Sequence, residues 1–157
     1  LEVWKKKLEK VQGKKKNNNF FSFFHTINWW LYIFTIWNVF SRTIYWYSHN
    51  RTSPKGKLLD AIKEKFGSFD NMWEEVKTLV TTLKCSGYVF LVKNQNNVID
   101  LISTSNQDSP YLFNLTPLFC IDLWEHAYYI NYENDKLEYF ENFKILANFN
   151  YANKNFN

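Results

Sequence analysis

The chain has 157 residues, a formal net charge of +4 and a hydrophobic fraction of 46%, with aromatic residues alone making up 20%. This length suffices for one domain with a sizeable core or for two small lobes, and the apolar content excludes a disordered chain. The mild positive charge suits the attraction of small anions, and it does not indicate nucleic-acid binding. The two cysteines, Cys85 and Cys120, form no disulfide framework, which favours a reducing compartment.

The first forty residues have a composition of their own. Residues 1–19 are rich in lysine and asparagine, and a solvated tail and a transit peptide are the two interpretations. Residues 20–40 contain no Asp, Glu, Lys or Arg. Three hypotheses remain for them: a membrane anchor, a buried aromatic helix, or a stretch foreign to the ancestral fold. Polar residues such as His25 and Asn28 are costly in hydrocarbon, so a membrane location is disfavoured.

Two helices are predicted next. Helical spacing of apolar residues predicts a helix over 57–66, ended by Gly67. Ser68 or Asp70 is expected to cap a second helix over 70–84. Its expected buried face consists of Met72, Trp73, Val76, Leu79, Val80 and Leu83.

The pattern then changes to that of strands. Aromatic and β-branched runs predict strands over 87–92, 98–104 and 118–122, with a turn at 94–97. Helices are expected again over 124–131 and 136–147, the latter with Leu137, Phe140, Ile145 and Leu146 as its apolar positions. Two helices, a small antiparallel sheet and further helices indicate an α+β fold.

Potential metal ligands are concentrated at the end of the third strand. An apolar run closes with Asp122, and His126 follows four residues later. Aspartate and histidine both bind metals, and a turn from strand to helix can direct both toward one ion. The sequence therefore predicts half or more of a metal site here.

The same stretch resembles a known family. Its Asp122-Leu123-Trp124-Glu125-His126-Ala127-Tyr128-Tyr129 string is similar to the signature of the iron/manganese superoxide dismutases. Further matches, in the family's order, are Phe66-Gly67-Ser68-Phe69, Ser86-Gly87, Ser103-Thr104-Ser105-Asn106-Gln107-Asp108-Ser109-Pro110, Thr116-Pro117, Asn131-Tyr132 and Tyr139. The resemblance implies that 57–157 form the C-terminal α/β domain, helices plus a three-stranded antiparallel sheet. Residues 38–56 would be a remnant of the N-terminal helical lobe with its linker, and 1–37 are unmatched.

The resemblance also implies a set of roles. One iron or manganese ion would be held by three histidines, one aspartate and a solvent molecule, with Asp122 and His126 as ligands. Trp124 would form an aromatic wall beside the metal, and Tyr129 would lie near the substrate gateway. Glu125 would reach across a homodimer to the partner's ligand histidine, and Gln107 would hydrogen-bond the bound solvent.

The N-terminal part departs from the family pattern. Residues 38–46 align with the string that carries another ligand histidine, and Arg42 occupies the ligand position. Arginine has no lone pair to offer a metal. No counterpart of the first ligand histidine occurs in 1–37, and His25 and His49 are expected to be ordinary polar residues. Lys136 stands where the family usually carries an arginine.

Two functions follow as expectations. The first is superoxide dismutation to dioxygen and hydrogen peroxide by a homodimer that meets through the Glu125–His126 region, with superoxide as the substrate. The second is a catalytically impaired or non-enzymatic protein of the same fold, such as a structural subunit or an incomplete gene product. Iron and manganese both remain open, although Gln107 favours manganese or dual use. A mitochondrial location is favoured, with the cytoplasm as the alternative.

Overall fold

The computed structural model of the chain describes residues 51–156. The predictions for 1–50, among them those on Arg42, His25 and His49, lie outside these residues. The described elements follow the predicted order, and the α+β class with a three-stranded antiparallel sheet is confirmed. They are α3 (Gly56–Phe66), α4 (Phe69–Thr82), β1 (Gly87–Lys93), β2 (Ile99–Ser105), the 3₁₀ helix η1 (Pro110–Phe113), β3 (Thr116–Asp122), α5 (Glu125–Tyr132), α6 (Lys136–Leu146) and α7 (Asn150–Asn155).

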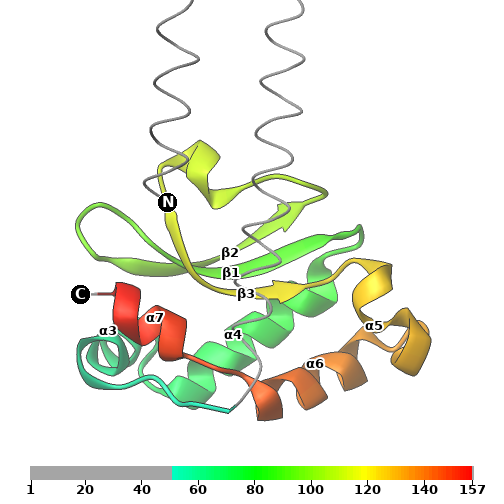
Figure 1. Ribbon diagram of the computed structural model, residues 1–157, viewed down its shortest axis with the longest axis horizontal. Helices are drawn as coiled ribbons and strands as arrows, with labels where there is room; N and C mark the ends of the chain where they lie inside the picture. The colour runs from blue at the N-terminus through cyan, green and yellow to red at the C-terminus, as the bar shows by residue number, and fades with distance from the viewer. Residues whose placement is uncertain (1–50, 157) are drawn as a thin grey trace, which may run out of the picture. The chain divides into compact units, whose positions relative to one another are not determined.

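The sheet has the strand order β2-β1-β3, with β1 antiparallel to both neighbours (Figure 1). Because both outer strands run opposite to β1, they run parallel to each other, and their carboxyl ends meet at one end of the sheet. At that end Tyr88 of β1 pairs with Thr104 on one side and with Asp122 on the other. The sheet therefore brings the last residues of β2 and β3 together.

Both faces of β1 are buried, as expected of a central strand. Its alternate residues belong to two different clusters of the core. Val89 and Leu91 join the larger cluster, which includes residues of α3, α4, α6 and α7 on one side of the sheet (Figure 1). Tyr88, Phe90 and Val92 join Cys120 in the smaller cluster on the opposite face. Asp122 lies on the face of the smaller cluster, because it pairs directly with Tyr88.

Aromatic rings hold the larger cluster together. The ring of Trp73 meets those of Phe119 and Phe140 edge to face, at centroid distances of 5.8 and 5.9 Å. Phe119 and Phe149 stack with 4.7 Å between their centroids. These contacts join β3 to α4, α6 and the segment before α7. They hold the strand that ends at Asp122 against the helices on one side of the sheet.

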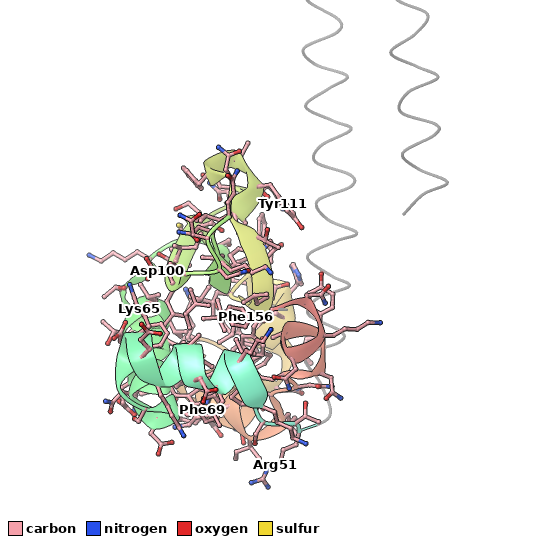
Figure 2. All side chains as sticks on the ribbon, turned by 90° about the vertical axis from the view of Figure 1, so that its left-hand side faces the viewer. Arg51, Lys65, Phe69, Asp100, Tyr111 and Phe156 are labelled. Carbon is pink, nitrogen blue, oxygen red and sulfur yellow. The ribbon has the colours of Figure 1, made fainter. Side chains whose placement is uncertain are left out.

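The two helices before the sheet begin and end largely as predicted. The α3 helix ends at Gly67, which has a φ of 81° and donates its N–H to the Lys63 carbonyl at 2.9 Å. Ser68 caps α4 by accepting the Asn71 N–H at 3.0 Å. The α4 helix stops at Thr82, two residues before the predicted end. Of the predicted buried face, Leu79 and Leu83 are partly buried and pack against the larger cluster. At the surface, an ion pair of 3.3 Å joins Lys65 of α3 to Asp100 of β2 (Figure 2).

The prediction for the apolar face of α6 is wrong in part. Phe140 is buried, but Leu137, Ile145 and Leu146 are exposed at 40%, 59% and 52%. The helix instead buries Tyr139 and Phe143 beside Phe140. Its aromatic residues form the stripe that fits against Trp73 and Phe119, which leaves the aliphatic residues at the surface. The short α7 helix was not predicted.

One negative observation concerns membranes. In the part of the chain from 51 to 156, none of the helices combines the length and the apolar character that crossing a bilayer requires.

Candidate metal centre

The turn from β3 into α5 positions the predicted aspartate. Asp122 is the last residue of β3 and is 5% exposed. Its Oδ1 accepts the backbone N–H of Trp124 at 2.9 Å, which closes the turn just before α5 begins at Glu125. One carboxylate oxygen therefore holds the turn, and the other points toward the helix.

That second oxygen faces the predicted histidine. Asp122 Oδ2 lies 3.3 Å from His126 Nε2. The side chain of Asp122 is 8% exposed and that of His126 is 57% exposed, so the pair lies at the boundary between core and surface. The His126 ring lies beside the Trp124 ring, at a centroid distance of 5.9 Å and an angle of 31°. The structure thus brings together Asp122, Trp124 and His126 at the turn from β3 into α5.

The geometry of this pair fits shared binding of a metal ion. Two donors that are each about 2.1 Å from one ion, at an angle of about 90–120°, lie about 3.0–3.6 Å apart. The observed separation of 3.3 Å falls inside that interval. Residues 51–156 contain no group of three or more His, Cys, Asp or Glu side chains that could hold a metal, so this pair needs further donors.

Gln107 reaches the same end of the sheet from β2. The chain turns after Ser105, where the Asp108 N–H bonds the Ser105 carbonyl at 3.1 Å and Asn106 adopts a φ of 51°. This turn is fixed to the start of β1, because the Asn106 N–H donates to the Ser86 carbonyl at 2.7 Å. Gln107 therefore follows β2 by two residues, as Trp124 follows β3.

Two buried polar atoms at this end of the sheet have complementary chemistry. Gln107 Oε1, an acceptor, and Trp124 Nε1, a donor, are buried and lack hydrogen-bond partners within residues 51–156. Buried groups of this kind are costly unless solvent or a ligand satisfies them. The orphaned atoms thus favour bound solvent at this end of the sheet.

The other predicted site residues lie on the outer side of α5. Glu125 is exposed, and Tyr129 is 58% exposed. Ile130, the next residue, is 89% exposed, which leaves an apolar side chain at the surface beside them. Within one chain these residues do not converge on the metal pair.

A cavity of about 250 Å³ lies between α5, the start of α6 and the α4–β1 connection. Lys136 lines it and donates to the Leu83 carbonyl at 3.3 Å, while its ammonium lies 5.9 Å from the centroid of the Tyr128 ring. Burial raises the pKa of the Tyr128 phenol, and the charge of Glu125 adds to this effect. The lysine thus ties α6 to both the end of α4 and the helix that carries His126.

Two neighbours of Asp122 were not predicted as part of the site. Tyr88 pairs with Asp122 across the sheet, and Thr104 pairs with Tyr88 on the other side. Both side chains are buried, at 4% and 5% exposure. Their place in one row with Asp122 depends on strand order and register, which no local sequence signal specifies.

Comparison with known proteins identifies the domain. The model of the family described as iron/manganese superoxide dismutases, C-terminal domain, matches residues 54–155. The chain is 38% identical to the iron superoxide dismutase of Legionella pneumophila over 123 residues, which cover 76% of the chain and 62% of that protein. It is 40% identical to the iron superoxide dismutase of Bordetella pertussis over 124 residues, covering 77% and 63%.

A third relative extends the match further along the chain. The Mn/Fe superoxide dismutase of Rickettsia typhi is 35% identical over 145 residues, which cover 90% of the chain and 65% of that protein. In each of these three comparisons the chain spans less than two thirds of the relative's length. With its matched C-terminal domain and these relatives, the chain belongs to the iron/manganese superoxide dismutase family.

Proposed function

We propose that the chain is a superoxide dismutase, an oxidoreductase that converts superoxide to dioxygen and hydrogen peroxide. The observation that carries the proposal is the separation of 3.3 Å between Asp122 Oδ2 and His126 Nε2 at the end of β3. The names of the relatives from Legionella pneumophila and Rickettsia typhi support the same activity. They favour the enzyme over the non-enzymatic alternative.

Iron or manganese is the metal we propose. A carboxylate and an imidazole are ligands that suit either ion, and the relatives are named for one or both of them. When bound, the metal would take an electron from one superoxide and give it to a second, which needs two protons to become peroxide. Asp122 and His126 are the ligands that the described residues would supply.

The neighbouring residues would control solvent at the metal. The buried amide oxygen of Gln107 and the buried indole N–H of Trp124 can each hold solvent in place, one as acceptor and one as donor. Ordered solvent next to the reacting anion is a source of the protons that peroxide requires. The ring of Trp124 lies against His126 and limits the positions open to that imidazole.

We further propose that the protein forms a homodimer through the outer side of α5. Glu125 and His126 are exposed there, next to Tyr129 at 58% and Ile130 at 89% exposure. An exposed apolar side chain beside a half-exposed metal ligand fits a surface that a second copy covers. Glu125 would then contact the partner's metal-bound histidine, and Tyr129 would line the approach of superoxide.

Sedimentation of the full chain tests this assembly. The wild type should sediment as a dimer, and Ile130→Lys should shift it toward monomer. Leu112→Lys, at another exposed apolar position, should leave the dimer intact. A wild type that stays monomeric at every concentration would contradict the proposed interface.

The mitochondrion is the proposed location, with the cytoplasm as the alternative. The basic composition of residues 1–19 supports a leader. Fractionation of cells that express the tagged full chain decides between the two compartments. Recovery in the membrane fraction after alkaline extraction would count against both.

Metal analysis combined with an activity assay tests the proposed reaction. The full chain, expressed with iron or manganese, should bind about one ion per chain and dismutate superoxide. Asp122→Asn keeps an oxygen that can accept the Trp124 N–H, but it removes the anionic ligand, so metal content and activity should both be lost. Asp60→Asn, at an exposed position of α3, is the matched control and should change neither. A metal-free, inactive wild type would support the non-enzymatic alternative instead.

A further inference from the structure

Thr104 lies in one row with the proposed metal ligand. The sheet register pairs Thr104 with Tyr88 and Tyr88 with Asp122. Residues directly opposite one another on neighbouring strands project to the same face of a sheet. Thr104, Tyr88 and Asp122 therefore share one face, at the end of the sheet where the metal pair lies.

The hydroxyl of Thr104 needs a partner. The residue is 5% exposed, and Thr104 Oγ1 has no hydrogen-bond partner in the described part of the chain. The flanking Ser103 and Ser105 project to the other face and are exposed, and the Ser105 hydroxyl accepts a hydrogen bond from Cys85 Sγ at 3.4 Å. A valine would fill the same space without a polar atom. A buried hydroxyl at this position is therefore costly unless it has a hydrogen-bond partner.

Three orphaned polar atoms belong to residues at this end of the sheet. They are Thr104 Oγ1, Gln107 Oε1 and Trp124 Nε1, and together they are all the buried side-chain atoms without a partner within residues 51–156. One is an acceptor, one is a donor, and the threonine hydroxyl can be either. A buried water typically makes about three hydrogen bonds to groups of this kind. One water molecule can bind all three groups: the water accepts a hydrogen bond from the indole N–H and donates one each to the amide oxygen and the hydroxyl.

We infer that Thr104 is a positioning residue of the site: its hydroxyl joins Gln107 and Trp124 in a buried, water-linked hydrogen-bond network. The water donates a hydrogen bond to the Gln107 amide oxygen. Because Thr104 holds this water in place, it fixes the orientation of the amide. The network also holds the Trp124 indole, whose ring lies against His126. The inference rests on the proposed function for its catalytic meaning, but the network itself does not require metal.

The test compares two substitutions of one side chain. Thr104→Val keeps the shape and removes the hydroxyl, whereas Thr104→Ser keeps the hydroxyl. Ser103→Ala, which removes an exposed hydroxyl from the same strand, is the matched control. The readout is the NMR signal of the Trp124 indole N–H in nitrogen-labelled full chain without metal. Trp124→Phe assigns it among the seven tryptophan indoles.

Thr104→Val should shift the Trp124 indole signal and speed its hydrogen exchange about tenfold, the order expected for the loss of one hydrogen bond. Thr104→Ser and Ser103→Ala should both retain the wild-type signal. An indole signal that is the same in the valine variant as in the wild type would overturn the inference. If the valine variant does not fold, the wild type still decides: indole exchange as fast as that of an exposed tryptophan excludes the network.

A separate experiment measures superoxide dismutation by the same variants. In metal-loaded protein, Thr104→Val should lower kcat while Thr104→Ser restores it, because the serine keeps the hydroxyl. If the wild type proves inactive while the valine variant still shifts the indole signal, the proposed function fails and the network stands. If the wild type is active and the indole signal does not respond, only the role of Thr104 fails.

Discussion

Gln107 and Trp124 follow two different strands by two residues each, and the antiparallel pairing of both strands with β1 brings the two residues to the same end of the sheet. One contributes a buried acceptor and the other a buried donor, and neither has a partner in the described part of the chain. Asp122 lies between them in the sequence and ends the second of these strands. The polar atoms of the site thus depend on the sheet register.

The pairing of β1 with β2 should be destabilised by any side chain at position 87, which is Gly87 in this chain. A Cβ at this position would lie 2.0 Å from the Thr104 carbonyl oxygen, so β1 and β2 could not keep their spacing. Gly87→Ala should lower the free energy of unfolding by about 1–3 kcal/mol or more, the range for overpacked sites. Urea denaturation measures the loss. Gly56→Ala is a useful comparison, because nothing lies within 4 Å of its Cβ and the cost there arises only from its φ of 55°.

The cap of α4 should contribute measurably to stability. Ser68→Ala removes the oxygen that accepts the Asn71 N–H at 3.0 Å and should cost about 1 kcal/mol of unfolding free energy. Ser68→Asp should restore most of it, since aspartate also caps helices and suits the positive end of the helix dipole. Thermal denaturation followed by circular dichroism distinguishes the two variants. Equal stability of all three proteins would contradict the role of the cap.

Lys136 should be a structural link between three helices. Lys136→Met retains much of the apolar stem but loses the hydrogen bond to the Leu83 carbonyl and the contact with the Tyr128 ring. We expect a loss of about 1 kcal/mol in unfolding free energy. Lys136→Arg keeps a cation and donors, so it should lose less. Chemical denaturation of the two variants beside the wild type provides the measurement, and a methionine variant as stable as the wild type would refute the link.

The phenol of Tyr111, on η1, should ionise at a higher pH than an ordinary tyrosine (Figure 2). Partial burial of the phenol, with a smaller contribution from Tyr151, raises its pKa from 10.0 to about 12. A folded-state pKa above the unfolded value means that the contribution to stability is present below about pH 10 and is lost as the pH rises toward 12.

Absorbance of the ionised phenol measures this titration. In the wild type, part of the tyrosinate signal should appear only near pH 12, and Tyr111→Phe should remove that part. A late component that persists unchanged in Tyr111→Phe would assign it to another tyrosine.

Local signals in the sequence were sufficient for much of the domain. The spacing of apolar residues and the Ser68 cap indicated α3 and α4, and the aromatic and β-branched runs indicated the strands. The Asp122–His126 pair could also be predicted, because a strand-to-helix turn of four residues is a local structure. The signature string around it sufficed to indicate the family.

Non-local packing decided the rest. The buried face of α6 consists of Tyr139, Phe140 and Phe143, because the rings of Trp73 and Phe119, which are distant in sequence, pack against this face. The row from Thr104 through Tyr88 to Asp122 exists only because the strands pair in the order β2-β1-β3 and in one register. A sequence lists side chains in order along the chain, whereas strand pairing brings together residues that lie far apart in it. The sequence by itself therefore indicated which residues could hold a metal, and the tertiary structure determined which polar atoms lie at the same end of the sheet.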